Sequence, residues 1–436
     1  MSKEKISIFW HRRDLRAHDN AGLYAALQGE YKVLPVFIFD RNILDELEDK
    51  KDRRVNFIYE ELQKVKMIYQ KHNSSLKVFY SKPKEAFEQL LEEYDIQAVY
   101  FNHDYEPYAR ERDKEIYYFL KDQNIEIHHK KDHAIFEKDE ILKGDGDPYT
   151  VYTPYSKKWK DKVTDDDLSS RPSEDYLQNL FNHTSFEIPS LEEMGFKAID
   201  YDYPDRELDM DIVKNYHNTR NIPSKNGTTK MSIHLRFGTV SIRELARKSS
   251  NKNTKYLNEL IWRDFYMMIL WHNPQVAEQS FRKEYDNIEW RNDEEEFERW
   301  CEGKTGYPII DAGMRELNET GYMHNRVRMI VASFLTKHLL IDWRWGERYF
   351  AQKLLDFELS SNNGGWQWAS GSGCDAAPYF RVFNPYLQTE KFDPKEKYIQ
   401  KWVPEYKDES YPEPVVEHKK GRERALETYK AGLNKV

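Results

Sequence analysis

Cysteine is scarce in this chain, which has only Cys301 and Cys374 among its 436 residues. Two cysteines are too few for the disulfide framework that stabilises small secreted domains. No group of cysteine and histidine residues has the spacing of a metal site either. The sequence therefore predicts a cytoplasmic protein in a reducing environment, with no bound metal.

Long hydrophobic runs are also missing. Only the five residues of ISIFW (6–10) separate the polar start MSKEK from the motif HRRD, and five residues are too few for a signal peptide or a membrane span. We therefore expect no association with membranes. Internal repeats and low-complexity tracts are absent too, and the hydrophobic content of 39% is enough for packed cores. A chain of this length accommodates two domains.

Positive charge is not in excess, because the formal net charge is −9. This balance argues against a surface that coats DNA uniformly. Residues 216–381 nevertheless hold 23 Lys and Arg against 21 Asp and Glu. A DNA-facing patch is compatible with this local balance, although a mixed, solvated surface explains most of these charges equally well.

The first part of the chain alternates short apolar runs with helical patterns. The runs at 6–10, 33–39, 76–80, 98–101 and 125–129 have the composition of strands. This alternation predicts a Rossmann-like α/β domain with a parallel five-stranded sheet. The turn after the first strand, HRRDLR, lacks the G-x-G-x-x-G fingerprint of a dehydrogenase, which argues against a nicotinamide-dependent enzyme.

A change of pattern divides the rest of the chain. Residues 143–159 and the acidic run to about residue 205 are typical of a long connection on the surface. From residue 216 on, apolar residues recur at helical spacing. We therefore expect an α/β domain at 1–132, a linker at 133–205 and a larger all-α domain at 206–436.

The most informative segment is NNGGWQWASGSGCDAAPYFRVFNP (362–385), which has the composition of a loop but carries two tryptophans and two adjacent asparagines. Glycine allows close backbone approach, and tryptophan offers a flat face that stacks and passes electrons. Asparagine both donates and accepts hydrogen bonds. The segment suits a bound ring system and an unstacked base. The alternative is that Trp366 and Trp368 are ordinary core anchors.

Hydroxyl groups gather in the motif NGTTKMSIHL. Thr228, Thr229 and Ser232 lie at the predicted start of a helix, where free backbone amides and hydroxyl donors form a phosphate site. An ordinary helix cap is the simpler interpretation of the same residues.

Two predicted helices each carry a polar stripe. Glu259, Trp262, Arg263 and Tyr266 have the spacing i, i+3, i+4 and i+7, which places them on one face. The alternative is a surface ion pair beside aromatic packing. Asn325, Arg328 and Met329 share a face in the same way, although a methionine is often only a core filler.

These motifs resemble the photolyase/cryptochrome family of FAD-dependent, light-driven proteins. The resemblance rests on segment 362–385 together with HRRDLRAHDN (11–20), NELIWRDFY (258–266), TGYPIIDAGMRELNETGYMHNRVRMIVASFL (305–335), NPYLQTEKFD (384–393) and EHKKGRERALETY (417–429). Within the family, the chain is most similar to the bacterial cyclobutane pyrimidine dimer photolyases. The resemblance implies a helical FAD-binding domain and the repair of dimers by electron transfer from excited, reduced FAD to a flipped-out dimer.

The resemblance also assigns cofactor contacts. Arg328 is expected to pair with Asp356 over the flavin, and the amide of Asn362 is expected beside flavin N5, where many signalling relatives carry Asp or Cys. The full set of expected FAD contacts is Tyr216, Thr228, Thr229, Lys230, Met231, Ser232, Tyr256, Arg263, Asn325, Arg328, Asp356, Phe357, Glu358 and Asn362.

Substrate contacts follow from the same resemblance. Glu259 is expected to hydrogen-bond the dimer, and Trp262 and Trp368 are expected to stack on it. Asn325 is expected to contact both the cofactor and the substrate, and Met329 favours cyclobutane dimers over (6-4) products. Ultraviolet-damaged DNA is the implied partner of a monomer, with Glu259, Trp262, Arg326, Trp368 and Arg381 as the DNA-binding residues.

An electron relay and an antenna complete the implied machinery. Trp366, Trp343 and Trp290 would pass electrons between the flavin and the surface. A second chromophore, a folate or a deazaflavin, is expected in the N-terminal domain with Glu106 as a contact, although this carboxylate could instead cap the helix near Pro107.

Two other classes of function compete with repair. A cryptochrome would bind FAD and signal without repair, but Asn362, Met329 and the expected lack of a C-terminal extension argue against it. A flavin oxidoreductase acting in the dark would need a substrate or nicotinamide site, for which we find no motif.

Overall fold

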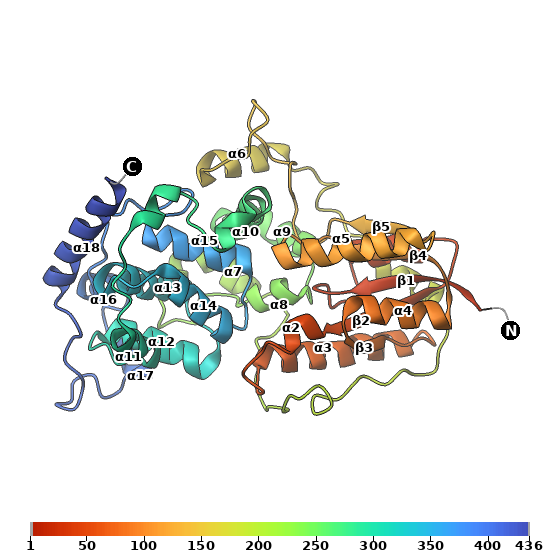
Figure 1. The fold of residues 1–436 in the computed structure, drawn as a ribbon, viewed down its shortest axis with the longest axis horizontal. Coiled ribbons are helices and arrows are strands. Elements are labelled where there is room, and N and C mark those ends of the chain that lie inside the picture. The colour runs from red at the N-terminus through yellow and green to blue at the C-terminus, as the bar shows by residue number, and fades with distance from the viewer. Residues whose placement is uncertain (1–2, 435–436) are drawn as a thin grey trace. The chain divides into compact units, whose positions relative to one another are not determined.

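Five parallel strands form one sheet with the order β3-β2-β1-β4-β5 (Figure 1). The strands are β1 (Lys5–His11), β2 (Val33–Asp40), β3 (Lys77–Ser81), β4 (Asp95–Asn102) and β5 (Glu126–Lys130). The inner strands β1 and β2 are buried along almost their whole length, as expected for a parallel sheet covered on both faces. The computed structural model describes residues 3–434, and it confirms the predicted α/β class and all five strands.

Helices cover this sheet. The helices α1 (Ala21–Leu27), α2 (Arg41–Leu44), α3 (Arg53–Gln70), α4 (Pro83–Glu93) and α5 (Pro107–Asp122) alternate with the strands. Phe87 and Leu90 of α4 and Ile116 and Leu120 of α5 are buried in one cluster with strand residues such as Ile8. The two helices therefore share one face of the sheet.

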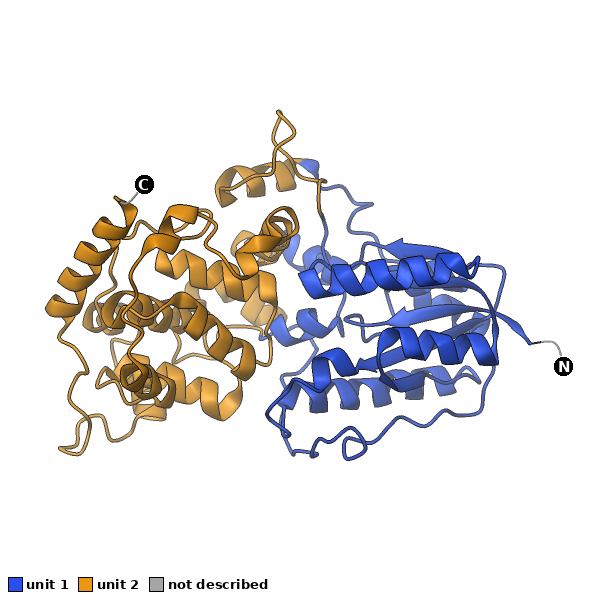
Figure 2. Ribbon diagram, in the orientation of Figure 1, with its two compact units in different colours: residues 1–137, 162–208, 230–250 blue, residues 138–161, 209–229, 251–436 orange. Residues whose placement is uncertain are grey.

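The chain forms two compact units, each built from three chain segments (Figure 2). Unit 1 contains residues 1–137, 162–208 and 230–250, including α8 (Ser232–Phe237) and α9 (Ile242–Ser250). Unit 2 contains residues 138–161, 209–229 and 251–436. These borders differ from the expected borders at 132 and 205, and the assignment of an antenna domain, a linker and a FAD domain remains a prediction.

Residues 143–205 were predicted to be a connection on the surface, but parts of this segment are buried. It contains a helix, α6 (Tyr152–Lys162), and a short 3-10 helix, η1 (Ser173–Asn179). Tyr155 and Trp159 are each only 1% exposed, and Leu180 is fully buried. The physical reason is that aromatic residues spaced i, i+3 and i+7 give α6 an apolar face that must be covered.

Unit 2 is almost entirely helical, as predicted. Its longer helices are α7 (Met210–Thr219), α10 (Thr254–His272), α11 (Glu294–Glu302), α12 (Pro308–Thr320), α13 (Asn325–Ser333), α14 (Trp343–Lys353), α15 (Leu359–Ser370), α16 (Pro385–Phe392), α17 (Lys397–Trp402) and α18 (His418–Leu433). A π-helix, η4 (Phe334–Leu339), follows α13 directly. Val331, Trp343 and Trp366 are buried at the centre of this unit.

The prediction of a loop over residues 362–370 is wrong, because these residues belong to α15. Two adjacent glycines usually weaken a helix. A Cβ atom on Gly364 would lie 2.3 Å from the ring of Tyr266 on α10, so the glycine lets the two helices approach closely. α15 ends where Gly371 adopts a left-handed conformation with φ of 95°.

Residues 3–434 contain no helix that is long and apolar enough to cross a membrane. The same part of the chain holds no cluster of three or more His, Cys, Asp or Glu residues arranged to bind a metal ion. Cys301 and Cys374 are both free thiols.

Candidate active site

The site begins with α10, whose first turn is capped by Asn253. The side chain of Asn253 accepts hydrogen bonds from the amides of Lys255 (3.0 Å) and Tyr256 (3.4 Å), which is the usual way to satisfy the free amides of a helix start. The apolar side of the helix is buried. The stripe of Glu259, Trp262, Arg263 and Tyr266 predicted from the sequence therefore lies on one regular helix.

Glu259 forms an ion pair with Arg220, which lies at the end of α7. Burial raises the pKa of Glu259, and the nearby Arg220 opposes this rise. A carboxyl group with a raised pKa is suited to sharing a proton with a carbonyl group. Sequence analysis did not identify Arg220, since it lies 39 residues before its partner and shares no pattern with it.

Trp262 is surrounded by aromatic side chains. Tyr152 of α6 stacks on it with ring centroids 3.6 Å apart. Phe265 meets it edge-on at 5.6 Å, and Tyr266 lies at 5.4 Å with tilted planes. The indole ring remains partly exposed, so the cluster holds the ring in place without enclosing it.

A buried ion pair connects α10 with the start of α15. Arg263 donates to Oε1 of Glu358 at 2.9 Å, and both side chains are less than 10% exposed. Glu358 is the N-cap residue of α15, where the helix dipole stabilises a negative charge. Breaking such a buried pair is costly, so the orientation of the two helices is fixed at this point.

The polar stripe of α13 is open on an otherwise buried helix. Asn325 is exposed and Arg328 and Met329 are partly exposed, whereas Val327 and Ile330 are buried. A helix in the centre of a unit normally buries all sides. The exposed stripe therefore marks a surface that is available to a ligand.

Arg328 forms the predicted pair with Asp356. Its Nη2 atom lies 3.1 Å from Oδ1 and 2.9 Å from Oδ2 of the carboxylate, and its Nε atom donates to the carbonyl of Met323 at 2.7 Å. The pair holds a guanidinium group beside the open stripe of α13, where it can stabilise negative charge on a ligand.

His324 precedes this stripe and has one ring nitrogen without a partner. Its Nδ1 atom accepts the amide of Arg326 at 3.1 Å, and the buried Nε2 atom has no hydrogen-bond partner within residues 3–434. Burial and the nearby charge of Arg328 lower the pKa of His324 to about 4. At neutral pH the ring is therefore neutral, and Nε2 carries an unused hydrogen-bonding site.

Asn362 on α15 is oriented by α14. Its amide Nδ2 donates to the carbonyl oxygen of Glu347 at 3.1 Å and to the carboxylate Oε1 of Glu347 at 2.8 Å. Both amide hydrogens therefore have acceptors, and the carbonyl oxygen of Asn362 remains for another donor. One turn further along, Gly365 faces open space, because a Cβ atom there would have no neighbour within 4 Å.

The three tryptophans that were predicted to form a relay lie in or against one core cluster of unit 2. A Cβ atom on Gly346 of α14 would lie 2.1 Å from Cη2 of Trp366, so Trp366 touches the α14 backbone. Trp343 lies one turn before Gly346 on the same helix and is 1% exposed. Trp290 is partly buried and meets the ring of Tyr429 edge-on at 5.8 Å.

The hydroxyl motif is divided between the two units. In unit 2, Thr229 Oγ1 lies 3.1 Å from the hydroxyl of Tyr256, whose ring meets that of Tyr216 edge-on at 5.3 Å. Lys230, Met231 and Ser232 belong to unit 1, where α8 begins at Ser232. Met231 is the N-cap residue and makes no side-chain cap bond. The motif is therefore not an ordinary helix cap.

The other predicted DNA contacts lie at or near the surface of unit 2. Trp368 is partly exposed and lies 6.5 Å from the ring of Phe383. Arg326 donates to Asn221 Oδ1 at 2.8 Å. Arg381 is exposed. Phe357, assigned to the cofactor, is partly buried against the core of unit 2.

Glu106 is held by two arginines of unit 1. Its Oε1 atom accepts from Arg236 at 2.7 Å and from Arg13 at 3.2 Å. Glu106 is the N-cap residue of α5, but its side chain makes no cap bond. The alternative interpretation of this carboxylate as a helix cap is therefore wrong, whereas its role as an antenna contact remains a prediction.

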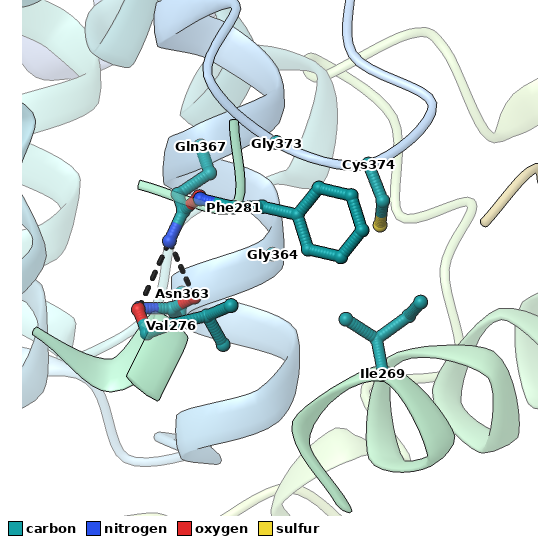
Figure 3. Close-up of a pocket in the computed structure, with 8 residues that line it drawn as sticks. All are labelled: Ile269, Val276, Phe281, Asn363, Gly364, Gln367, Gly373 and Cys374. Carbon is teal, nitrogen blue, oxygen red and sulfur yellow. Dashed lines mark hydrogen bonds between the residues drawn. The ribbon is translucent and has the colours of Figure 1, made fainter. Parts of the chain in front are cut away.

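A small cavity beside α15 is too small for a ligand. Its volume is about 10 Å³, and it is lined by Ile269, Val276, Phe281, Asn363, Gly364, Gln367, Gly373 and Cys374 (Figure 3). The amide of Gln367 donates to the carbonyl of Val276 at 2.9 Å and to Asn363 Oδ1 at 3.1 Å. This volume holds one water molecule at most, so the cavity does not belong to the binding surface.

These observations fit a flavin nucleotide. A ring system would find flat and polar surfaces at the open stripe of α13, at the open backbone of Gly365 and at the free carbonyl of Asn362. The Nε2 atom of His324, which has no partner, offers a further hydrogen bond to a ligand. Sequence analysis missed Tyr152, Arg220, His324 and Glu347. Tyr152, Arg220 and Glu347 contact residues that were predicted, His324 has the unpartnered Nε2 atom, and no local pattern indicated any of the four.

Comparisons with known protein families identify the family of this chain. Residues 7–173 match the family of DNA photolyase, and residues 256–410 match the FAD binding domain of DNA photolyase. A deoxyribodipyrimidine photo-lyase from Synechococcus sp. is 36% identical over 458 residues, which cover 94% of this chain and 93% of that protein.

Solved structures give the same result. A bacterial class III photolyase from Agrobacterium tumefaciens has a TM-score of 0.89 and 31% identity, with 100% of this chain and 99% of that chain covered. An archaeal photolyase from Sulfolobus tokodaii, described with two FAD molecules, has a TM-score of 0.84 and 35% identity, with 98% and 99% covered. The chain therefore belongs to the photolyase/cryptochrome family.

Proposed function

We propose that the protein is a deoxyribodipyrimidine photo-lyase, which uses light to split cyclobutane pyrimidine dimers in DNA. Relatives with this name cover nearly the whole chain, and a flavin-binding region of the same family covers the centre of unit 2. The protein therefore depends on FAD and acts on ultraviolet-damaged DNA.

The observation that carries the proposal is the buried pair of Arg263 and Glu358. It joins the helix of Glu259 and Trp262, assigned to the substrate, to the helix of Asn362, assigned to the flavin. A fixed connection between these helices keeps the flavin and the dimer at a constant separation, which favours electron transfer between them.

FAD, when bound, supplies the light-excited electron that opens the cyclobutane ring. Asn362, whose amide hydrogens are held by Glu347, would accept a hydrogen bond from the N5–H group of the reduced flavin through its carbonyl oxygen. The pair of Arg328 and Asp356 holds positive charge beside the ring system. The remaining cofactor contacts are Tyr216, Thr228, Thr229, Lys230, Met231, Ser232, Tyr256, Arg263, Asn325, Phe357 and Glu358.

The substrate residues act on a dimer that has left the DNA stack. Trp262 and Trp368 offer partly exposed aromatic faces, and stacking on such faces stabilises an unstacked base by about 1–3 kcal/mol. Glu259, with its raised pKa, hydrogen-bonds a pyrimidine carbonyl. Asn325 and Met329 complete the contact from the open stripe of α13.

The relay of Trp366, Trp343 and Trp290 prepares the cofactor by passing electrons inward. The contact of Trp366 with α14 and the position of Trp343 one turn away support this role. Trp290 is the member nearest the surface, because it alone of the three is partly exposed.

Phosphate contacts, with Arg326 and Arg381 as contributors, position the DNA without reading its sequence. The protein acts as a monomer in the cytoplasm, where light reaches both the DNA and the flavin. The sheet of unit 1, which lies within the predicted range 1–132, forms the antenna domain, and the helices of unit 2, which make up most of the predicted range 206–436, form the catalytic domain. A folate or deazaflavin bound near Glu106 would extend the range of light that the protein absorbs.

The test is a repair assay with ultraviolet-irradiated DNA and purified protein that contains reduced FAD. We expect loss of dimers under near-ultraviolet or blue light and none in the dark. A cryptochrome-type receptor, the alternative function, would bind FAD and leave the dimers intact in both conditions. Loss of dimers in the dark would contradict a light-driven mechanism.

A further inference from the structure

The ring of Tyr152 lies flat on the ring of Trp262. Their centroids are 3.6 Å apart and their planes differ by 4°, which leaves almost no offset between the rings. Aromatic pairs in proteins usually prefer offset or edge-to-face arrangements, as Phe265 shows by meeting Trp262 at 81°. Tyr152 therefore covers one face of the indole, while the ring as a whole remains partly exposed.

Hydrogen bonds hold Tyr152 in this position at two points. Its hydroxyl group donates to the carbonyl of Asn258 at 3.0 Å, and this carbonyl begins the helical turn that ends at Trp262. Its backbone amide donates to Oδ2 of Asp375 at 3.1 Å. Asp375 has a φ of 49°, which is uncommon for a residue other than glycine and is maintained by the contacts around it.

The helix that carries Tyr152 is itself fixed to α10. Tyr155 packs on Phe265 with ring centroids 5.2 Å apart. Trp159 donates its Nε1 hydrogen to Oδ2 of Asp264 at 2.9 Å. Because these contacts lie on one face of α6, the ring of Tyr152 cannot leave Trp262 without breaking several buried interactions. The stack is a permanent support rather than a lid.

We propose that Tyr152 is a positioning residue for the substrate, which fixes the plane of Trp262 so that its other face is ready for an unstacked pyrimidine. The inference rests on the proposed function, because it takes Trp262 as the stacking partner of the dimer. A ring that is already ordered loses less conformational freedom when the base binds. Asp375 lies seven residues after Trp368, so the same tyrosine also ties α10 to the segment that follows the second stacking residue.

Three variants test this inference. Tyr152→Leu removes the flat ring, and Tyr152→Phe keeps the ring and removes only the hydroxyl bond. Tyr155→Leu removes another buried ring of α6, which packs on Phe265 and not on Trp262. For each, the dissociation constants for a dimer-containing and an undamaged oligonucleotide are measured together with the thermal midpoint and the FAD content.

We expect Tyr152→Leu to weaken binding of dimer-containing DNA about tenfold, since base stacking is a main part of such binding, and to change binding of undamaged DNA by less than twofold. Tyr152→Phe should remain within about threefold of the wild type. Tyr155→Leu should lower the thermal midpoint at least as much as Tyr152→Leu and leave the preference for dimers unchanged. Normal dimer binding by Tyr152→Leu, or an equal loss in Tyr155→Leu, would overturn the inference.

Changes at Asp375 provide a second test that leaves the aromatic stack chemically intact. Asp375→Gly removes the acceptor of the Tyr152 amide, whereas Asp375→Asn keeps an oxygen acceptor and tolerates the positive φ. We expect a loss of dimer preference in the glycine variant and its recovery in the asparagine variant. Equal behaviour of the two variants would contradict the proposed support. If the wild type itself neither binds nor repairs dimers, the proposed function fails instead.

Discussion

At the scale of single residues, the site is built from pairs in which one partner holds the other. Glu347 fixes the amide of Asn362, Arg220 faces Glu259, and Tyr152 supports Trp262. In each pair the outer residue determines the orientation or the charge of the inner one. A substitution of Asn362, Glu259 or Trp262 therefore also removes or changes the hydrogen bond, ion pair or ring contact of its partner.

Asn362→Asp is the most informative change at this scale. The new carboxylate would take the place of the amide that lies 2.8 Å from Glu347 Oε1, and two carboxylates at this distance cannot both be ionised easily. Burial raises the pKa of Glu347, and the new carboxyl group adds negative charge beside the position assigned to the flavin to the extent that it ionises. We expect the anionic reduced flavin to become less stable, with a midpoint potential lower by on the order of 50 mV, close to the 59 mV of a tenfold change in a one-electron equilibrium.

An anaerobic redox titration followed in the visible spectrum measures this effect. The single variant Glu347→Gln serves as the control, because it removes the neighbouring carboxylate without adding one at position 362 and should not lower the potential. An unchanged potential in Asn362→Asp would show that this residue does not lie at N5.

In the three pairs named above, the patterns in the sequence indicated Asn362, Glu259 and Trp262 but not their partners. Arg328 and Asp356 were predicted as a pair from the family pattern, and they are in contact. Arg220 and Tyr152 were missed because they come from α7 and α6, and their contacts with α10 depend on how distant segments pack. A periodic pattern shows which residues of one helix share a face, but it does not show what covers that face.

At the scale of helices and strands, local composition was a good guide only where burial is uniform. The inner strands were predicted because a buried parallel strand is a nearly continuous apolar run, whereas β5 is exposed or only partly buried along its length. α15 was predicted as a loop because of its glycines. Its helix forms because Gly364 and Gly346 allow close contact with Tyr266 and Trp366, and this tertiary contact outweighs the low helix propensity of glycine.

Gly346→Ala tests the contact between α14 and α15. The new methyl group would lie 2.1 Å from Cη2 of Trp366 and 2.6 Å from Leu335, so the two helices must separate. We expect a loss of about 1–3 kcal/mol in the free energy of unfolding and slower photoreduction of oxidised flavin, because Trp366 moves away from its neighbours. Chemical denaturation and the absorbance change under illumination measure these effects.

Gly144→Ala is the matched control, since no atom lies within 4 Å of the added methyl group, and it should alter neither measurement. In Trp343→Phe we expect photoreduction to be blocked while chemically reduced enzyme still repairs dimers. Normal photoreduction in both Gly346→Ala and Trp343→Phe would show that electrons do not pass through this contact.

The π-helix η4 contains a buried lysine that makes stability depend on pH. Lys337 is 1% exposed, donates to the carbonyl of Tyr379 at 2.9 Å and lies 4.4 Å from the ring centre of Tyr429. Burial lowers the pKa of Lys337 from 10.5 to about 7. Between pH 7 and pH 10.5 Lys337 is protonated in the unfolded chain and neutral in the folded chain. The free energy of unfolding therefore rises with pH between these two values, and this increase is lost as the pH falls to 7.

We expect the wild type to gain roughly 1–2 kcal/mol in the free energy of unfolding between pH 7 and pH 9 relative to Lys337→Met, which has no group to titrate. Urea denaturation at both pH values measures the difference. Lys353 is an exposed lysine, so the stability of Lys353→Met should have the same pH dependence as that of the wild type. The same pH dependence in Lys337→Met and the wild type would mean that Lys337 stays charged in the folded protein.

At the scale of the whole molecule, the order of segments along the chain does not match their grouping in space. Each compact unit takes up three separate segments, whereas the sequence suggested two domains and a linker. Composition marks a polar and acidic stretch, but it does not show whether that stretch packs on a core, as Leu180 and Trp159 do. The class of fold was therefore predictable, and the borders of the units were not.

The net charge of −9 makes the interaction with DNA depend on a few well-placed cations. Binding that releases counterions weakens as salt increases, with a slope of about −0.9 in log K against log salt for each phosphate contact. Arg381 is exposed and Arg326 is only partly used by Asn221, so both can reach a phosphate group. We expect Arg381→Gln and Arg326→Gln each to reduce the magnitude of the slope by about 0.9. Each should also weaken the binding of damaged and undamaged DNA to the same extent.

Titrations of labelled oligonucleotides at several salt concentrations give these slopes. Lys114 is exposed on α5 of unit 1, so Lys114→Gln provides the control and should leave the slope unchanged. The two arginine variants should also keep the preference for dimers, because phosphate contacts position the DNA and do not recognise the lesion. This behaviour is the opposite of that expected for Tyr152→Leu, which should lose the preference and keep the salt slope. If an arginine variant lost the preference for dimers and kept the slope, its side chain would contact the lesion and not the backbone of the DNA.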